Sequence, residues 1–299
     1  MSASTTSAAT ADQVVKSPPT RRTMAVLSAI ARAPAGRTSA ELARECAITS
    51  STCALVLAEL EADGWVVRHD DRRYALGSGL FGLVHGLRRQ FPLLDRGRDA
   101  LVFLNARLQA GCSMSRIGDQ RLTTVDALGH GTDGEHAVGQ CFPIDPPFGL
   151  VAMAWRDEAT VESWLRAVTP RLDQTDISRY RSVLEAIRTR GYGAWRFDEA
   201  HAPLHDRLSS VLASMEPTDR VTRRLSTLLT MVTLQSVTHS IQTDLASTEF
   251  VVLPIFGAHG QPEYQIEIHL GGRSELTLHE LEGALTHAQE LLTPTAGHN

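Results

Sequence analysis

Three stretches near the N-terminus carry apolar residues at helical spacing, which predicts three short helices. The first is Arg22–Ala33, and the second starts after Thr38 or Ser39, since either side chain can cap it. The third begins at Thr49-Ser50-Ser51 and runs to about Ala62. The apolar positions behind these predictions are Met24, Leu27, Ile30 and Ala31, then Leu42, Ala43 and Cys46, then Cys53, Val56, Leu57 and Leu60.

The period then changes from helical to alternating. Trp65–Arg68 and Arg73–Leu76 have the pattern of two short strands, and Asp70-Asp71-Arg72 between them is a natural turn. Three helices followed by a hairpin are the layout of a winged helix-turn-helix. We therefore expect a DNA-binding domain over residues 20–78, preceded by a disordered tail over residues 1–19.

A short amphipathic linker helix is predicted over residues 79–92. Its apolar stripe consists of Leu80, Leu83, Val84 and Leu87. A helix of this length is not stable alone in water. It therefore packs either on the rest of its own chain or on the same helix of a second subunit, and we expect a homodimer or tetramer.

Residues 93–299 predict an α+β domain in which an antiparallel sheet is flanked by helices. Its strongest strand signals, Phe250–Phe256 and Tyr264–Leu270, come late and are joined by a tight turn at 259–262. A helical insertion is expected over about 199–248, with Thr218–Asp244 as its longest helix. The other predicted elements are a helix from Leu93 that buries Leu94, Leu101, Leu104 and Leu108, strands over Met114–Ile117 and Leu122–Leu128, a loop over Gly129–Gly139, and helices over Glu158–Val168, Ile177–Arg190 and Leu278–Leu292.

Composition and charge exclude several classes of protein. A hydrophobic fraction of 42% supports folded cores, and no run of eighteen apolar residues suggests a membrane span. The N-terminus lacks the pattern of a secretory signal, and the four cysteines lack disulfide or metal spacing, so we expect a cytoplasmic protein with buried thiols at Cys46 and Cys53. Residues 1–89 carry eleven basic and eight acidic side chains, whereas residues 90–299 carry eighteen and twenty-six. This asymmetry suits a regulator with one DNA-facing end.

Motifs for catalysis and for cofactor or metal binding are not found. The chain has no GxSxG, no P-loop and no GxGxxG after a strand. His201 and His205 stand four residues apart, but Pro203 separates them, and His130 and His136 fall in a Gly-rich loop. We interpret these histidines as surface residues, and we expect no enzyme, no cofactor and no metal.

The stretch RTMAVLSAIARAPAGRTSAELARECAITSSTCALVLAELEADGWVVRHDDRRYALGSGLFGL, residues 22–83, resembles the N-terminal domain of the IclR family of transcription regulators. Together with the body, the resemblance covers most of residues 20–299. It implies a GAF-like effector domain, dimers or tetramers, and binding to operator DNA. The N-terminal block is the more specific half, and its matching features are Ser39–Ala43, Ser51-Thr52, Leu57 with Leu60, Gly64 and Tyr74–Gly77. The body matches more patchily, at Phe142-Pro143-Ile144 with Gly149, Ile187–Tyr192, and Leu253–Phe256 with Gly260.

Three departures from the family pattern change the expected chemistry. Leu55 stands in the recognition helix where a basic residue is usual, and about fifty residues separate Asp198 from Glu249 where the family is short. In the ligand loop, Asp145-Pro146-Pro147-Phe148 replaces small polar residues, and Leu150 replaces a lysine. Rigid prolines and bulky side chains reduce the room for a ligand. We expect either a flat, apolar or aromatic effector or none at all, and Asp145 disfavours a simple carboxylate.

The DNA-facing residues follow from which side of the third helix is buried. Its N-terminal hydroxyls and Leu55 face outward, where Leu55 can touch a thymine methyl group. Arginines must come from elsewhere, because none lies between Glu45 and Val67. The predicted DNA-binding set is Arg21, Arg22, Arg44, Thr49, Ser50, Ser51, Thr52, Leu55, Arg68, Arg72 and Arg73. The alternatives are plain N-capping for the hydroxyls and solvated surface charge for each arginine.

An aromatic-rich stretch supplies the predicted effector-binding set, which is Phe142, Asp145, Phe148, Met153, Trp155 and Pro254. The alternatives are ordinary core packing for the aromatic residues and a turn position for Asp145.

The whole pattern favours a sequence-specific DNA-binding transcription regulator of the IclR type. Its expected partners are an operator in double-stranded DNA, a second copy of the chain and a small-molecule effector, with no membrane partner. The alternative is an interaction or oligomerisation protein that keeps the fold but has lost effector binding or specific DNA readout.

Overall fold

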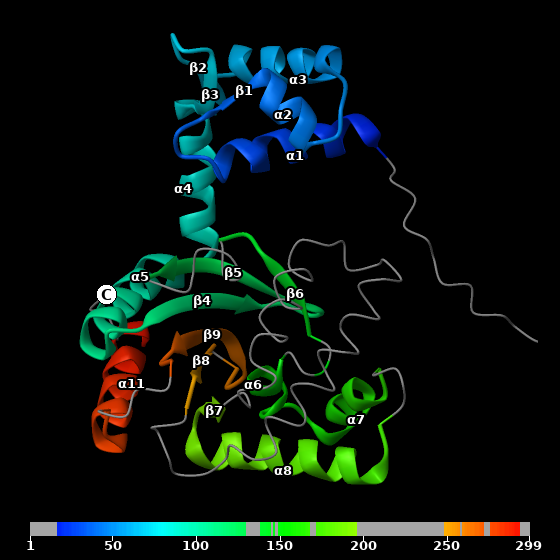
Figure 1. Cartoon of the computed structure of the whole chain (residues 1–299). Coiled ribbons are helices and arrows are strands. Elements are labelled where there is room, and N and C mark those ends of the chain that lie inside the picture. The colour runs from blue at the N-terminus through cyan, green and yellow to red at the C-terminus, as the bar shows by residue number, and fades with distance from the viewer. Residues whose placement is uncertain are drawn as a thin grey trace, which may run out of the picture. The chain divides into compact units, whose positions relative to one another are not determined.

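The computed structural model describes residues 17–129, 138–144, 146, 149–167, 172–195, 248–257, 259–271 and 276–293. The chain divides between Pro92 and Leu93 into two compact units (Figure 1). Some predictions lie outside the described residues. They are the tail up to residue 16, the loop over 130–137 with His130 and His136, the insertion over 199–247 with Thr218–Asp244, and the pair His201 and His205.

The N-terminal unit is a winged helix-turn-helix. Its three strands are antiparallel in the order β1-β3-β2, and the hairpin β2-β3 follows the third helix as predicted. The elements are α1 (Pro18–Ala31), β1 (Arg37–Thr38), α2 (Ser39–Glu45), α3 (Ser50–Ala62), β2 (Val66–Arg68), β3 (Arg73–Leu76), the short 3₁₀ helix η1 (Ser78–Leu80) and α4 (Phe81–Gln90).

Three details of this unit differ from the prediction. Helix α1 begins at Pro18, inside the expected tail, because proline is well suited to the first helical positions. Its buried stripe is Val26, Ala29 and Ile30, whereas Met24 is 64% exposed. The two stripes overlap at helical spacing, so periodicity alone did not separate them. Strand β1 was not predicted, since two residues carry no measurable period.

Helix α4 contains no buried residue. Leu83, Val84 and Leu87, on the predicted apolar stripe, are 51%, 41% and 49% exposed, and Phe81 beside them is 73% exposed. The stripe is therefore uncovered in the single chain.

The C-terminal unit is built on a six-stranded antiparallel sheet with the strand order β6-β5-β4-β9-β8-β7. Helices lie on both of its faces (Figure 1), which confirms the α+β class. The elements are α5 (Leu93–Leu108), β4 (Gly111–Ile117), β5 (Arg121–Leu128), β6 (Cys141–Pro143), α6 (Leu150–Met153), α7 (Glu158–Arg166), α8 (Gln174–Arg190), β7 (Gly193–Trp195), β8 (Phe250–Phe256), β9 (Pro262–His269) and α11 (Leu278–Leu292).

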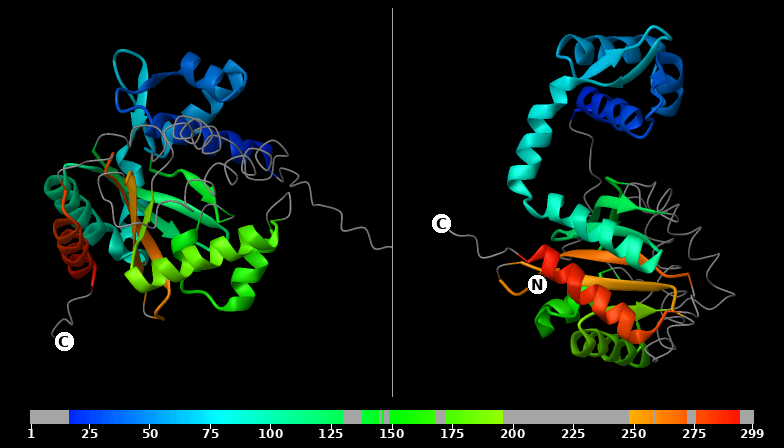
Figure 2. Two further views of the ribbon diagram at one scale, coloured as in Figure 1. Left: turned by 60° about the horizontal axis from the view of Figure 1, so that its bottom comes forward. Right: turned by 90° about the vertical axis from the view of Figure 1, so that its left-hand side faces the viewer.

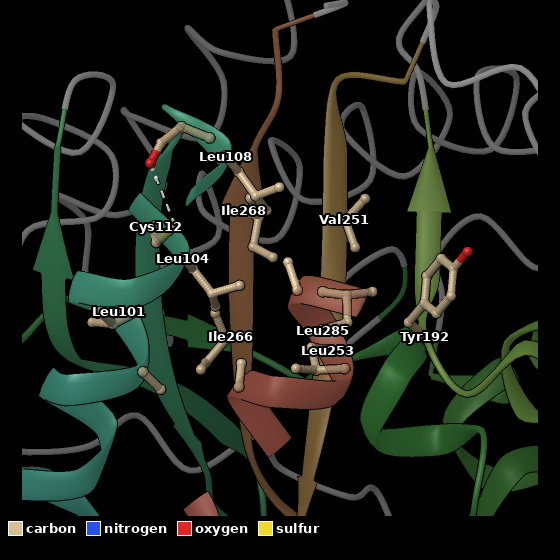
Figure 3. Packing of buried hydrophobic residues seen from close by; sticks show 14 of the residues in the cluster. Leu101, Leu104, Leu108, Cys112, Tyr192, Val251, Leu253, Ile266, Ile268 and Leu285 are labelled. Carbon is tan, nitrogen blue, oxygen red and sulfur yellow. Dashed lines mark hydrogen bonds between the residues drawn. The ribbon is translucent and has the colours of Figure 1, made fainter. Parts of the chain in front are cut away.

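Two hydrophobic cores flank this sheet. On one face α5 and α11 lie side by side (Figure 2) and pack on β4, β5 and β8. Leucines of these helices meet the isoleucines of β9 and the aliphatic side chains of β8 there (Figure 3). The second core joins α6, α7 and α8 to residues of β4, β5 and β8 on the other face. The face that α5 and α11 cover is apolar at its centre, with the ion pair of Arg98 and Asp126 beside it, whereas the other face has a mixed character.

Most elements of this unit lie close to their predicted ranges. The bounds of β8 and α11 are as predicted, whereas β9 begins at Pro262, which was assigned to the turn. Helix α8 begins three residues earlier than expected, because Asp173 caps it. Strands β6 and β7 and helix α6 were not predicted, since three or four residues give too short a pattern.

Candidate nucleic-acid interface and effector region

The turn between α2 and α3 is fixed by local hydrogen bonds. Thr38 and Glu41 form a capping box at the start of α2: the Thr38 N–H donates to Glu41 Oε2 at 2.8 Å, and the Glu41 N–H donates to Thr38 Oγ1 at 3.3 Å. These bonds lower the pKa of Glu41, and the Thr38 backbone N–H contributes most. After α2, the Ile48 N–H bonds the Ala43 carbonyl at 3.0 Å. Helix α3 therefore leaves the turn in a defined direction.

The hydroxyl groups at the start of α3 divide into two kinds. Thr49 is the N-cap: its Oγ1 accepts from the Thr52 N–H at 3.2 Å and donates to Thr52 Oγ1 at 2.8 Å. Thr49 and Thr52 thus bond each other, which agrees with the alternative that these hydroxyls cap the helix. Ser50 and Ser51 are exposed on the first turn, and the Ser51 hydroxyl lies 3.1 Å from that of Thr49.

The outer face of α3 is exposed as predicted. Cys53, Leu57 and Leu60 are buried against the core. On the opposite side Leu55 is 71% exposed, with Ala54 and Ala58 exposed beside it.

The predicted arginines come before and after α3 in the sequence, and they differ in what their side chains contact. Arg21 and Arg22 are exposed in the first part of α1, and Arg44 is exposed in the last turn of α2. Arg68 is exposed on β2, with its guanidinium 5.8 Å from the centre of the Tyr74 ring. Arg72 is exposed at the hairpin turn, where its φ of 65° is in the left-handed region.

Arg73 has a structural role that the sequence did not reveal. Its Nη1 donates to the Gly36 carbonyl at 3.2 Å and lies 3.5 Å from Glu41 Oε2, while its Nε lies 3.6 Å from Asp71. These contacts join the hairpin to the start of β1 and to α2. A substitution of Arg73 would therefore disturb the fold of the wing as well as its charge.

Three glycines bring the end of α3 against the start of the linker. The Gly79 N–H donates to the Gly64 carbonyl at 2.9 Å, and the Gly77 N–H donates to the Trp65 carbonyl at 2.7 Å. A β-carbon at Gly77 would lie 2.2 Å from the Gly64 oxygen, and one at Gly79 would lie 2.6 Å from the Asp63 oxygen. Only glycine permits this backbone approach.

The predicted effector residues are not all brought to one site. Phe142 and Met153 are each 7% exposed and belong to the second core, as the packing alternative holds. Trp155 is partly buried with its ring edge-to-face against Phe256, at 5.1 Å between centroids. Asp145 and Phe148 lie outside the described residues. Pro254 is buried on β8.

A row of polar side chains across the sheet was missed. Thr124, Ser115, Gln265 and Pro254 are successive cross-strand partners on β5, β4, β9 and β8. The three polar residues are only 1%, 8% and 7% exposed, and the Ser115 and Thr124 hydroxyls lie 3.5 Å apart. They alternate with Met114, Leu253 and Ile266, which face α5 and α11. The row therefore lies on the other face of the sheet, where α6 contacts β8 and β9.

This row continues toward two titratable side chains. Ser113, 1% exposed, pairs with Glu267, which in turn pairs with Val252. Glu267 lies 3.7 Å from His269 Nε2, and the His269 ring packs edge-to-face on Phe250. The sequence signal was the alternation of small polar and apolar residues in Cys112-Ser-Met-Ser and Tyr264-Gln-Ile-Glu. It looks like that of a half-exposed strand, although this face is buried.

The cysteines are free thiols, three of them in apolar surroundings. Burial raises the pKa of Cys46 and of Cys53, and it raises the pKa of Cys112 to about 12. Within the described part of the chain, no cluster of three or more His, Cys, Asp or Glu side chains is arranged to hold a metal ion. The described helices also include none that is long and apolar enough to span a membrane.

Comparisons with known proteins agree with this architecture. Residues 18–73 match the model of a family described as the MarR family, and no curated protein sequence matches the chain. Three crystal structures are similar at 18% identity: an IclR from Thermotoga maritima, with a TM-score of 0.54 over 91% of this chain and 96% of that one; an IclR homolog from Microbacterium hydrocarbonoxydans complexed with 4-hydroxybenzoate, with 0.55 over 92% and 98%; and HmgR from Pseudomonas aeruginosa, with 0.54 over 91% and 97%.

The fold is thus a winged helix-turn-helix joined to an α+β unit with a six-stranded antiparallel sheet. More particularly, it is the fold of the IclR-family transcription regulators, which these structures share over nine-tenths of the chain.

Proposed function

We propose that this protein is a sequence-specific, DNA-binding transcription regulator of the IclR type. The observation that carries the proposal is the exposed outer face of α3, the second helix of a helix-turn-helix, with Ser50 and Ser51 at its N-terminus. Such a helix enters the major groove with its N-terminal residues. Hydroxyl groups there bond phosphates or base edges, and the helix dipole favours the approach of phosphate.

Phosphate attraction comes from arginines outside α3. Arg68 and Arg72 are exposed on the wing, and Arg44 is exposed in the last turn of α2. Arg73 is excluded from this group because Glu41, Asp71 and the Gly36 carbonyl already bind it. The remaining arginines supply the sequence-independent part of the affinity, which weakens as salt rises.

The test is binding of the full-length protein to the DNA upstream of its own gene at increasing salt. We expect specific binding, and in the variant Arg68→Ala/Arg72→Ala a slope of log K against log salt that is smaller by about one for each phosphate that the variant no longer neutralises. The control is Arg166→Ala/Arg179→Ala, which removes two exposed arginines of the other unit. An unchanged slope would remove the wing from the interface. Failure of the wild type to prefer any duplex would instead favour an interaction protein that keeps the fold without DNA readout.

For the C-terminal unit, we infer a small-molecule effector with a flat, apolar or aromatic body and a neutral hydrogen-bonding group. The buried row of Thr124, Ser115 and Gln265 supports the polar part of this proposal, because hydroxyl and amide groups can both donate hydrogen bonds to a ligand and accept them from it. Pro254 ends the row, and Val252 belongs to the adjoining core. The complex of one similar structure with 4-hydroxybenzoate is consistent with an aromatic body. Glu267 beside the row disfavours a simple carboxylate.

A thermal-shift screen of neutral aromatics, aromatic acids and small hydrophilic carboxylates tests this effector. We expect an aromatic compound to raise the melting temperature, and Gln265→Leu, which removes the amide at similar volume, to abolish most of that shift. Val102→Ala on the outer side of α5 is the matched control, since this side chain is 48% exposed. Stabilisation by a hydrophilic carboxylate, undiminished in Gln265→Leu, would contradict the proposal.

A further inference from the structure

Leu55 occupies the centre of the outward face of α3. An α-helix turns by about 100° per residue, so Leu55 lies roughly 160° around the helix from both Cys53 and Leu57. Those two side chains are at most 1% exposed, whereas Leu55 is 71% exposed. Its neighbours on the same face, Ala54 and Ala58, are small. Leu55 is therefore the side chain that projects furthest toward whatever this face contacts.

The chemistry of α3 restricts which bases it can read. Guanine is read in the major groove by Arg or Lys, and adenine by Asn or Gln. The segment 46–66 contains none of these four residue types, nor any histidine. What remains are hydroxyl groups, which discriminate weakly, and apolar contact with the 5-methyl group of thymine. Leu55 is the large apolar side chain positioned for that contact.

The acidic residues of α3 determine which part of the helix can lie against DNA. Glu59, Glu61 and Asp63 are all exposed in the second half of the helix and its C-cap. Their charges are repelled by the phosphate backbone, whereas the first half of α3 carries no charged side chain. The N-terminal half therefore enters the groove, and Leu55 stands at the end of that half.

We infer that Leu55 is a specificity-determining residue that selects thymine in each half-site through its 5-methyl group. The inference rests on the proposed DNA-binding function and names the feature that the recognition helix reads. Readout at this position is by shape and methyl contact, in place of the hydrogen bonds that a basic or amide side chain would make. It predicts a half-site in which one thymine is required for its methyl group more than for its pairing edge.

Replacement of thymine by deoxyuracil tests the inference, because it removes the methyl group and leaves base pairing unchanged. The duplex is the one that full-length protein selects from a random-sequence library. At one thymine of the half-site we expect binding to weaken about fourfold, the effect of removing one buried methylene-sized group. In Leu55→Ala the same replacement has no effect. In Leu55→Arg the preferred base at that position changes from thymine to guanine.

Met24→Ala is the matched control, since it truncates another exposed apolar side chain of the same unit. In Met24→Ala, replacement of the thymine by deoxyuracil should still weaken DNA binding about fourfold. Because the Leu55 side chain is exposed, circular dichroism and melting of Leu55→Ala should equal those of the wild type.

Two results would overturn the inference. If the selected duplex binds but no deoxyuracil replacement weakens it, or if the weakening persists in Leu55→Ala, Leu55 does not read the methyl group, and the regulator function stands. If the wild type selects no duplex at all, the DNA-binding function itself fails, and this inference falls with it.

Discussion

At the scale of single residues, helices α5 and α11 each contain a glycine, in opposite surroundings. A β-carbon at Gly97 would lie 2.5 Å from the sulfur of Met114, which is fully buried on β4. A β-carbon at Gly283 would meet nothing within 4 Å. Substitution of glycine by alanine should therefore affect the stability of the protein differently at the two positions.

We expect Gly283→Ala to stabilise the protein by about 1 kcal/mol, the difference in helix propensity between glycine and alanine. Gly97→Ala gains the same propensity but overpacks the core, which costs about 1–3 kcal/mol, so its net effect is between about zero and about 2 kcal/mol of destabilisation. Denaturant unfolding measures both. In a Met114→Ala background the clash is gone, and Gly97→Ala should become favourable. Equal stabilisation by the two single variants would mean that Met114 has room to move.

At the scale of elements, the sequence predicted the long helices and strands, in which a hydrophobic pattern repeats several times. It missed the elements that are too short for any pattern to repeat. Helices α3, α5 and α11 and strand β8 each contain seven residues or more, and threonine N-caps mark the starts of α3 and α11. Strands β1, β6 and β7 contain two or three residues and exist only because a neighbouring strand pairs with them. Tertiary pairing of this kind leaves no local signal.

The candidate sites divide in the same way. The outward face of α3 could be predicted because it is the complement of a buried stripe on one helix. The polar row could not, because Thr124, Ser115 and Gln265 come together only through the register of three strands. Likewise, the ties from Arg73 to Gly36 and Glu41 cross between segments far apart in sequence, so nothing local separated Arg73 from Arg72.

At the scale of the whole molecule, the exposed apolar stripe of α4 indicates a surface that a second subunit covers. Leu83, Val84 and Leu87 are each between 41% and 51% exposed. Identical stripes are self-complementary across a two-fold axis, so we propose that two copies of α4 pair in a homodimer. Such a dimer would present two recognition helices to a two-fold symmetric operator.

Leu87→Glu should weaken dimerisation by on the order of 2 kcal/mol, about thirtyfold in the dissociation constant, since a charge would be buried in place of leucine. Sedimentation at several protein concentrations measures it. Met24→Glu places the same charge on another exposed apolar position of this unit and should leave the dimer intact. A wild type that sediments as a monomer at micromolar concentration while still binding DNA would refute the proposal.

The glycine junction between α3 and the linker has a mechanical consequence. Gly64 and Gly79 bond backbone to backbone, and η1 runs directly into α4. If α3 reads DNA and α4 pairs with its mate as proposed, this backbone hydrogen bond couples the orientation of one helix to that of the other. In such a dimer, a rotation of one α4 helix against its mate would move α3 as well and would alter the distance between the two recognition helices. A signal that reaches α4 could thus change which half-site spacing is bound without touching a residue that contacts DNA.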